Sequence, residues 1–108
     1  MLDACERTVA IVANLERRHF DDWSLERLAV ERLLLVIGEA AKGIPPAVRT
    51  ELPAINWRNA GGLRDRIVHQ YADTDPDILW STVTVDVPAM VPHLRALLTK
   101  LQAGAPDG

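Results

Sequence analysis

The segment from about Ser24 to Lys42 constrains the fold most, because it predicts one long helix with a wide apolar face. Ser24 suits the N-cap, and Glu26 suits the first turn, where a carboxylate faces the positive end of the helix dipole. At the far end Gly43 can supply a left-handed stop, and Pro45-Pro46 prevents continuation. A helix this apolar should lie centrally in a bundle. The residues that we expect to cover its wide apolar face are Leu25, Leu28, Ala29, Leu33, Val36, Ile37, Ala40 and Ala41.

Helical periodicity also marks the rest of the chain. The expected elements are a first helix over about Leu2–Arg18, a short turn of helix over Pro46–Leu52, a third main helix capped by Asn56, and a last helix begun by Asp75-Pro76 and running to about Gln102. Pro88 and Pro92 predict a kink or break near Asp86-Val87. No strand-like alternation stands out. We therefore expect an all-α antiparallel bundle of four or five helices, with one domain over residues 1–102 and a tail over 103–108.

A glycine pair interrupts the third main helix. Each glycine inside a helix costs on the order of 1 kcal/mol, so Gly61-Gly62 needs an explanation. Either another helix approaches the backbone closely there, or the helix starts after Gly62. We favour the close approach.

The composition excludes several classes of protein. A chain of 108 residues with 48% hydrophobic and 25% charged residues is globular rather than disordered. The single cysteine, Cys5, lies among apolar helical positions, which favours a core residue over a nucleophile. The strongest apolar run, Leu33–Ile37, is too short to span a bilayer, and no signal peptide is visible. We expect a cytoplasmic protein with no membrane contact.

The net charge of −3 argues against a general nucleic-acid coat protein, which is usually basic over a whole face. If RNA binds, a local patch must bind it. The segment 57–71 carries Arg58, Arg64 and Arg66 against one acid, Asp65. Two-fold symmetry would double that patch.

The same segment holds the residues best suited to chemistry. Arg64 can grip phosphate oxygens in a planar fork, and the His69 imidazole can move a proton near neutral pH. Five residues correspond to about 140° around an ideal helix, so Arg64 and His69 do not share a face. The spacing predicts a site at a helix end that faces a cleft, completed by a turn or by a partner subunit. A solvated arginine beside a histidine that caps the helix is the alternative.

Five segments in order carry a family resemblance. They are Ile37-Gly38-Glu39-Ala40-Ala41-Lys42, Ile55-Asn56-Trp57-Arg58, Arg64-x4-His69-x-Tyr71, Asp77-Ile78-Leu79-Trp80 and Asp86-Val87-Pro88. Over roughly residues 2–102 this order resembles the HepT-like toxins, a branch of the HEPN superfamily. The Arg-x4-His core alone would be a weak signal, whereas the ordered series is specific.

The resemblance implies a homodimeric, metal-independent endoribonuclease toxin that needs no cofactor. Its partner would be a minimal-nucleotidyltransferase antitoxin. In that family the catalytic pair corresponds to Arg64 and His69, and the antitoxin attaches AMP to the motif tyrosine, here Tyr71. The scattered His19, His69 and His93 give no metal-ligand spacing, in agreement with a metal-free site.

Two acidic residues bear on this expectation. Asp65 stands where many relatives have asparagine, and a carboxylate there can tie up Arg64 or Arg66 and repel phosphate. Glu39 lies among apolar residues, so it either reaches water at the edge of the apolar stripe or, as we expect, meets Arg64 or Arg66 and fixes the guanidinium. Two rival interpretations are a non-catalytic module that binds a nucleotide or docks the antitoxin, which the acidic balance favours, and a purely structural helical dimer.

Overall fold

The computed structural model describes residues 1–21, 24–69 and 75–103, and within 64–69 it describes only the side chain of Asp65. The elements are α1 (Leu2–Val12), a 3-10 turn η1 (Arg17–Phe20), α2 (Leu25–Lys42), α3 (Pro46–Glu51), α4 (Trp57–His69), α5 (Pro76–Ser81), a π-helical turn η2 (Thr82–Asp86) and α6 (Val87–Ala103). The described ranges contain no strand, which confirms the all-α prediction. None of their helices has the length and apolar character needed to cross a membrane.

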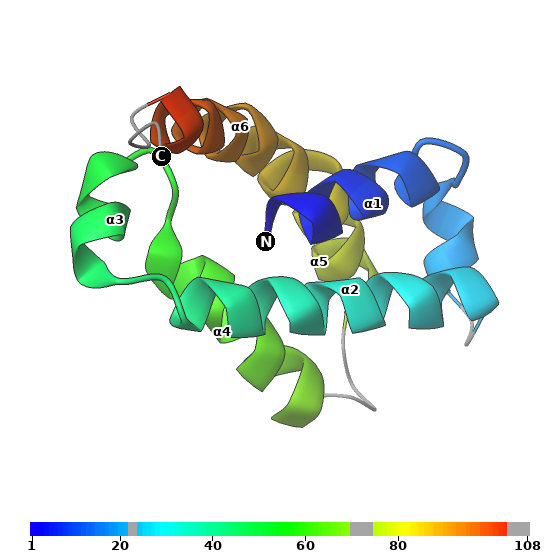
Figure 1. Ribbon diagram of the computed structural model, residues 1–108. Helices are drawn as coiled ribbons and strands as arrows, with labels where there is room; N and C mark the ends of the chain where they lie inside the picture. The colour runs from blue at the N-terminus through cyan, green and yellow to red at the C-terminus, as the bar shows by residue number, and fades with distance from the viewer. Residues whose placement is uncertain (22–23, 70–74, 104–108) are drawn as a thin grey trace.

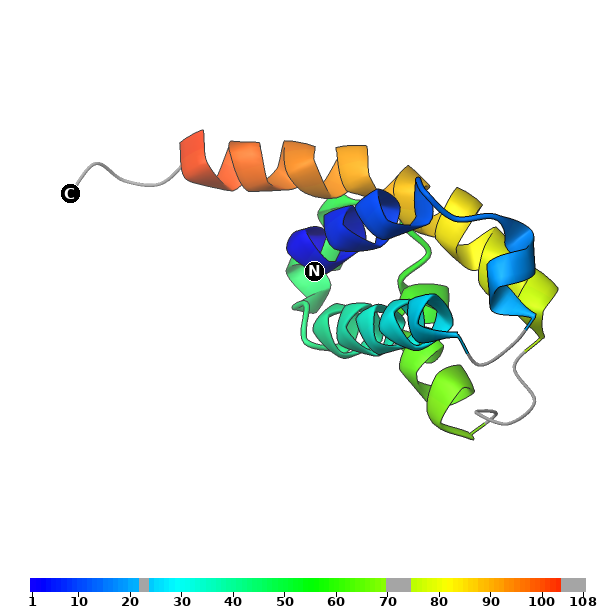
Figure 2. The same cartoon turned by 90° about the vertical axis from the view of Figure 1, so that its right-hand side faces the viewer.

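Helix α2 is the central element of the bundle, as predicted. It packs against α4 on one side and α1 on the other, and α1 in turn packs against α6 (Figures 1 and 2). Val30, Leu34 and Ile37 of α2 are almost completely buried. The Ser24 side chain accepts a hydrogen bond from the Arg27 N–H, so the predicted N-cap is confirmed.

The buried face of α2 differs from the predicted one. Leu25 is 82% exposed, and Leu28 and Val36 are also exposed, whereas Arg27 and Glu31 are buried. Arg27 Nε donates to Glu31 Oε1 over 3.0 Å, and Arg27 Nη1 donates to the Phe20 carbonyl. An ion pair one turn apart can satisfy most of its own polar groups, which lets it replace apolar residues in the core.

The end of α2 also differs from the prediction. Gly43 is right-handed, with φ −81°, so no left-handed stop is present. Arg49 takes over part of the capping, because its guanidinium donates to the carbonyls of Ile44, Lys42 and Ala41. The carbonyls that a left-handed glycine would help to satisfy are thus bound by a side chain.

The first helix is shorter than predicted. It ends at Val12 rather than near Arg18, and η1 follows with Glu16 as its cap. The Glu16 N–H donates to His19 Nδ1 over 2.8 Å, which starts a new turn. That turn carries Phe20 into the core, where its ring meets Trp80 edge to face at 5.5 Å. A straight helix to Arg18 would leave this aromatic contact unmade.

The predicted break near Asp86-Val87 is a widened turn rather than an end of the helix. Asp75 caps α5 and Pro76 opens it, as expected. Pro88 has no N–H for the carbonyl of residue 84, and the preceding turn is π-helical, with the Val87 N–H bonded to the Thr82 carbonyl. Pro92 lies inside α6 without ending it.

Cys5 is a core residue, as predicted. Its side chain is completely buried, and burial raises the pKa of the thiol to about 11, with a smaller raising effect from Glu6 and a lowering one from the N-terminus. A protonated and inaccessible thiol is a poor nucleophile.

The buried Arg27–Glu31 pair generates a stability prediction. The two side chains are only 5% and 3% exposed, and Glu31 Oε2 has no hydrogen-bond partner among the described residues. Arg27→Met should lower the free energy of unfolding by about 3–5 kcal/mol, because it strands a buried carboxylate. The double variant Arg27→Met/Glu31→Leu should recover most of that loss. Urea unfolding followed by circular dichroism measures both, and equal stability of Arg27→Met and wild type would contradict the prediction.

Candidate functional site

Helix α4 carries the residues predicted to do chemistry. Asn56 caps it as predicted, because its Oδ1 accepts from the Asn59 N–H at 3.0 Å. Ala60 and Leu63 are buried. The backbone of Arg64 and His69 lies in the last two turns of the helix. The site therefore stands on a rigid element held against α2.

Several predicted residues lie outside the described part of the chain. The side chains of Arg64, Arg66 and His69 are not described, and Tyr71 lies wholly outside. That Arg64 and His69 converge on one pocket accordingly stays a prediction.

The helix runs unbroken through Gly61-Gly62, so the interpretation that it starts after Gly62 is wrong. Close approach of another element explains the pair only in part. A Cβ built on Gly61 would lie 3.4 Å from Lys42 Cγ, an atom of a flexible side chain, and one built on Gly62 would meet nothing within 4 Å. Packing among the described residues therefore does not account for a cost of about 1 kcal/mol per glycine.

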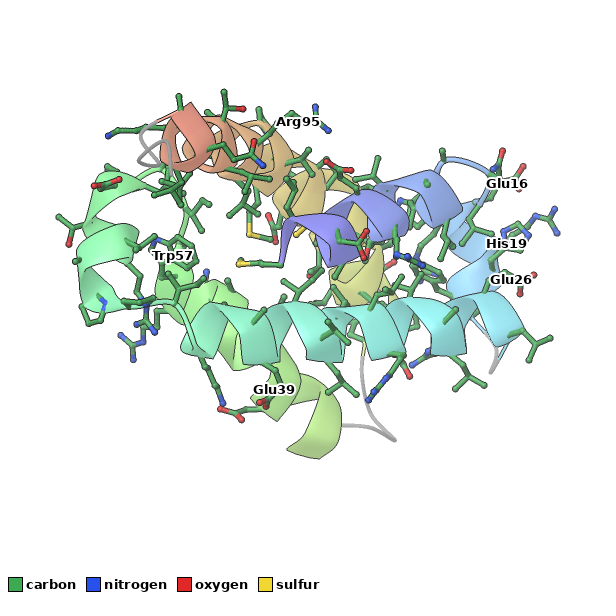
Figure 3. All side chains as sticks on the ribbon, viewed as in Figure 1. Glu16, His19, Glu26, Glu39, Trp57 and Arg95 are labelled. Carbon is green, nitrogen blue, oxygen red and sulfur yellow. The ribbon has the colours of Figure 1, made fainter. Side chains whose placement is uncertain are left out.

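A pocket of about 380 Å³ lies over these glycines, between α2 and α4. Trp57 lines it, and its indole Nε1 donates to the carbonyls of Arg49 and Leu52. Figure 3 shows Trp57 between α3 and α4. The charged residues of the pocket are Lys42, Arg49, Arg58 and Asp65.

The charged residues of this pocket differ in how far their polar groups are already bound. Asp65 Oδ1 accepts from Lys42 Nζ at 2.9 Å, so a lysine holds the carboxylate that we expected to tie up Arg64 or Arg66. Contacts of Asp65 with those arginines fall outside the described residues. Arg49 Nε donates to the Ile44 carbonyl, and Arg49 Nη2 donates to the Lys42 carbonyl. Arg58 is exposed and has no polar partner within the described ranges.

Comparison with known proteins identifies the family. A family model described as "Ribonuclease HepT-like" matches residues 1–97, nearly the whole chain. The chain belongs to the HepT-like ribonuclease family. The resemblance to the HEPN superfamily and the prediction of a ribonuclease are thereby confirmed.

Relatives of this HepT-like ribonuclease span most of its length. A protein of Methanocaldococcus jannaschii named "Putative RNase MJ1216" is 28% identical over 102 residues, covering 94% of this chain and 84% of its own. The "Probable ribonuclease HepT" of Thermococcus cleftensis is 38% identical over 74 residues, covering 66% and 67%. "Putative RNase TTE0752" of Caldanaerobacter subterraneus is 27% identical over 100 residues, covering 93% and 89%. No solved structure matches the chain.

Glu39 lies on α2 and is exposed rather than buried. Figure 3 shows its side chain below α2, on the side where α4 runs. The structure of this HepT-like ribonuclease does not describe the side chains of Arg64 and Arg66. The expected contact of Glu39 with one of them therefore stays a prediction.

Sequence reasoning missed two residues of the pocket. Lys42 was assigned only to the last turn of a helix, and Arg49 had no assigned role. The glycine pair was the available signal, because it marks the surface that these cations flank. Among the described residues of this HepT-like ribonuclease, no group of three or more His, Cys, Asp or Glu side chains could hold a metal ion.

Proposed function

We propose that the protein is an endoribonuclease toxin that cleaves RNA without a metal ion, using Arg64 and His69. The observation that carries this proposal is the match of residues 1–97 to the HepT-like ribonuclease family, in a chain that holds the Arg-x4-His motif. The place of both residues on α4, beside a pocket rich in cations, supports it.

In the proposed reaction, a base removes the proton of the ribose 2′-hydroxyl and the 2′-oxygen attacks the adjacent phosphorus. The bond from phosphorus to the 5′-oxygen then breaks, and an acid protonates the leaving oxygen. His69 performs one of these proton transfers. The Arg64 guanidinium holds the phosphate and stabilises the charge of the transition state. The products are a 2′,3′-cyclic phosphate and a 5′-hydroxyl.

Arg58 and Arg66 bind RNA around this centre. The exposed Arg58 suits contact with backbone phosphates, since its fork is not bound by a described side chain. Glu39 orients an arginine of α4. Asp65 weakens phosphate binding unless Lys42 keeps it neutralised.

A homodimer supplies the second proton transfer in this proposal. The outward face of α2 exposes Leu25, Leu28 and Val36, three apolar side chains that share this face with the exposed Arg32. A second copy packed on this face would bring two α4 helices, and hence two His69 residues, toward one cleft. The five-residue spacing of Arg64 and His69 then needs no distortion of the helix.

A minimal-nucleotidyltransferase antitoxin would neutralise the toxin by attaching AMP to Tyr71. The modification adds a phosphodiester charge two residues after His69. Such a group would compete with RNA for nearby cations and fill the cleft.

The cleavage prediction uses purified protein and RNA in EDTA. Wild type should cleave, whereas His69→Ala should be slower by about 10²–10⁴-fold, the range for loss of a positioned acid–base group. Arg64→Ala should be slower by about 10²–10³-fold, the range for loss of one group that stabilises transition-state charge. His93→Ala and Arg95→Ala on α6 are matched controls and should keep full activity, because both side chains are exposed there. Chromatography of the products should show cyclic phosphate ends. Equal rates in wild type and both α4 variants would favour a binding module instead.

The dimer prediction concerns Val36. Val36→Glu should convert the dimer to a monomer in light scattering, because a charge replaces an apolar side chain at the proposed interface. Helicity should persist, since Val36 is already 39% exposed in one protomer. Val85→Glu on η2 is the control, with an exposed fraction of 60%, and should stay dimeric. A dimeric Val36→Glu would exclude this face.

The modification prediction depends on Tyr71 being the sole tyrosine of the chain. Coexpression with a cognate minimal nucleotidyltransferase should raise the intact mass by one or more AMP units. Tyr71→Phe should abolish the increase and leave cleavage in place. An increase that survives in Tyr71→Phe would assign the modification to another residue.

A further inference from the structure

The Gly61-Gly62 pair leaves an open patch of helix backbone that nothing described in the protomer fills. A Cβ on Gly62 would meet no atom within 4 Å, and a Cβ on Gly61 would meet only the flexible stem of Lys42. Two adjacent glycines weaken a helix, so their presence needs a benefit. Close approach of a ligand to the backbone is such a benefit when no neighbouring element uses the space.

The pocket over the glycines has the charge that an anion requires. Lys42, Arg49 and Arg58 line it against the single carboxylate of Asp65, whereas the whole chain carries a net charge of −3. Arg49 donates to backbone carbonyls through Nε and Nη2, and its Nη1 has no hydrogen bond to any described residue. Nη1 is therefore available to an anion. The guanidinium of Arg58 is exposed. Local positive charge on an acidic protein concentrates anions at one place.

We infer that this pocket is a subsite for a backbone phosphate of single-stranded RNA, held by Arg58, Arg49 and Lys42 over the bare backbone of Gly61-Gly62. The inference rests on the proposed ribonuclease function and extends it to substrate binding. Bidentate arginine contacts and a mobile lysine are the usual protein donors to phosphate. The absence of a Cβ lets the sugar-phosphate chain lie directly on the helix.

The position of the pocket on α4 separates this phosphate from the scissile one. Arg64, which holds the scissile phosphate in the proposed reaction, follows Gly62 by two residues, about 200° around an ideal helix. His69 follows Gly62 by seven residues, about 10.5 Å along the helix axis. The subsite therefore holds a nucleotide that flanks the cleaved bond, and it fixes the register of the strand on α4.

The test measures binding of a fluorescent single-stranded oligoribonucleotide by anisotropy, with all variants built in the cleavage-deficient His69→Ala chain. Gly62→Leu should fill the pocket and weaken binding at least tenfold. Gly62→Ala adds one methyl group that meets no atom of the protein but enters the space assigned to the phosphate, so it should weaken binding by a smaller factor than Gly62→Leu. Thermal melting checks that both variants remain folded.

Charge variants test the same subsite without touching the helix backbone. Arg58→Gln should weaken binding and reduce the salt dependence of the affinity by about one phosphate contact. Asp65→Asn should strengthen binding, because it removes the carboxylate that holds Lys42. Arg7→Gln is the matched control, with its exposed guanidinium bonded to Asp3 on α1, and it should leave binding unchanged.

The outcomes separate this inference from the proposed function. Cleavage by wild type together with unchanged binding in Gly62→Leu and Arg58→Gln would overturn the subsite alone. No cleavage by wild type, with binding lost in both variants, would overturn the enzyme and leave the subsite standing. If the His69→Ala chain in which the variants are built binds no RNA, the subsite is also excluded. Variants that keep RNA but lose a coexpressed antitoxin would reassign the pocket to a protein partner.

Discussion

The packing of α4 against α2 is the contact on which the rest of the structure depends. Ile37 and Ala41 on α2 and Ala60 and Leu63 on α4 are all buried, and the two helices share the most extensive interface of the fold. Burial of such side chains contributes about 1.5–3 kcal/mol for each large one, so the interface is stable enough to fix α4 in place. The backbone positions of the proposed catalytic residues on α4 depend on this contact.

Polar contacts at the end of α2 then set where α4 begins. Arg49 binds the last carbonyls of α2, and Trp57 Nε1 binds the carbonyls of Arg49 and Leu52. These hydrogen bonds fix the chain reversal through α3 at the end of α2 and at the start of α4. These bonds satisfy groups that would otherwise be left unpaired where the helices end, and they hold Arg49 beside the glycine pair.

The sequence predicted where the helices begin better than which of their side chains are buried. Ser24, Asn56 and Asp75 marked helix starts correctly, because a cap is a local interaction between a side chain and the next turn. The burial of Arg27 and the exposure of Leu25 could not be predicted in this way, since both depend on which helices pack on α2. Two pocket cations, Lys42 and Arg49, were missed for the same reason. Lys42 and Asp65 are 23 residues apart and meet only in three dimensions.

An acidic protein that acts on RNA must confine its attraction to one place, and the fold provides a means. Most described cations are held by nearby carboxylates, as Arg17 is by Asp77 and Asp21 and Arg95 is by Glu6. Such pairs add little stability when exposed, but each removes a positive charge from the field seen by a polyanion. Arg58 on α4 and Arg32 on α2 differ from these pairs, because both are exposed and no described carboxylate neutralises either one. In the proposed function, charge pairing elsewhere leaves these two arginines and the pocket on α4 as the places that attract an incoming strand, without any need for a basic surface.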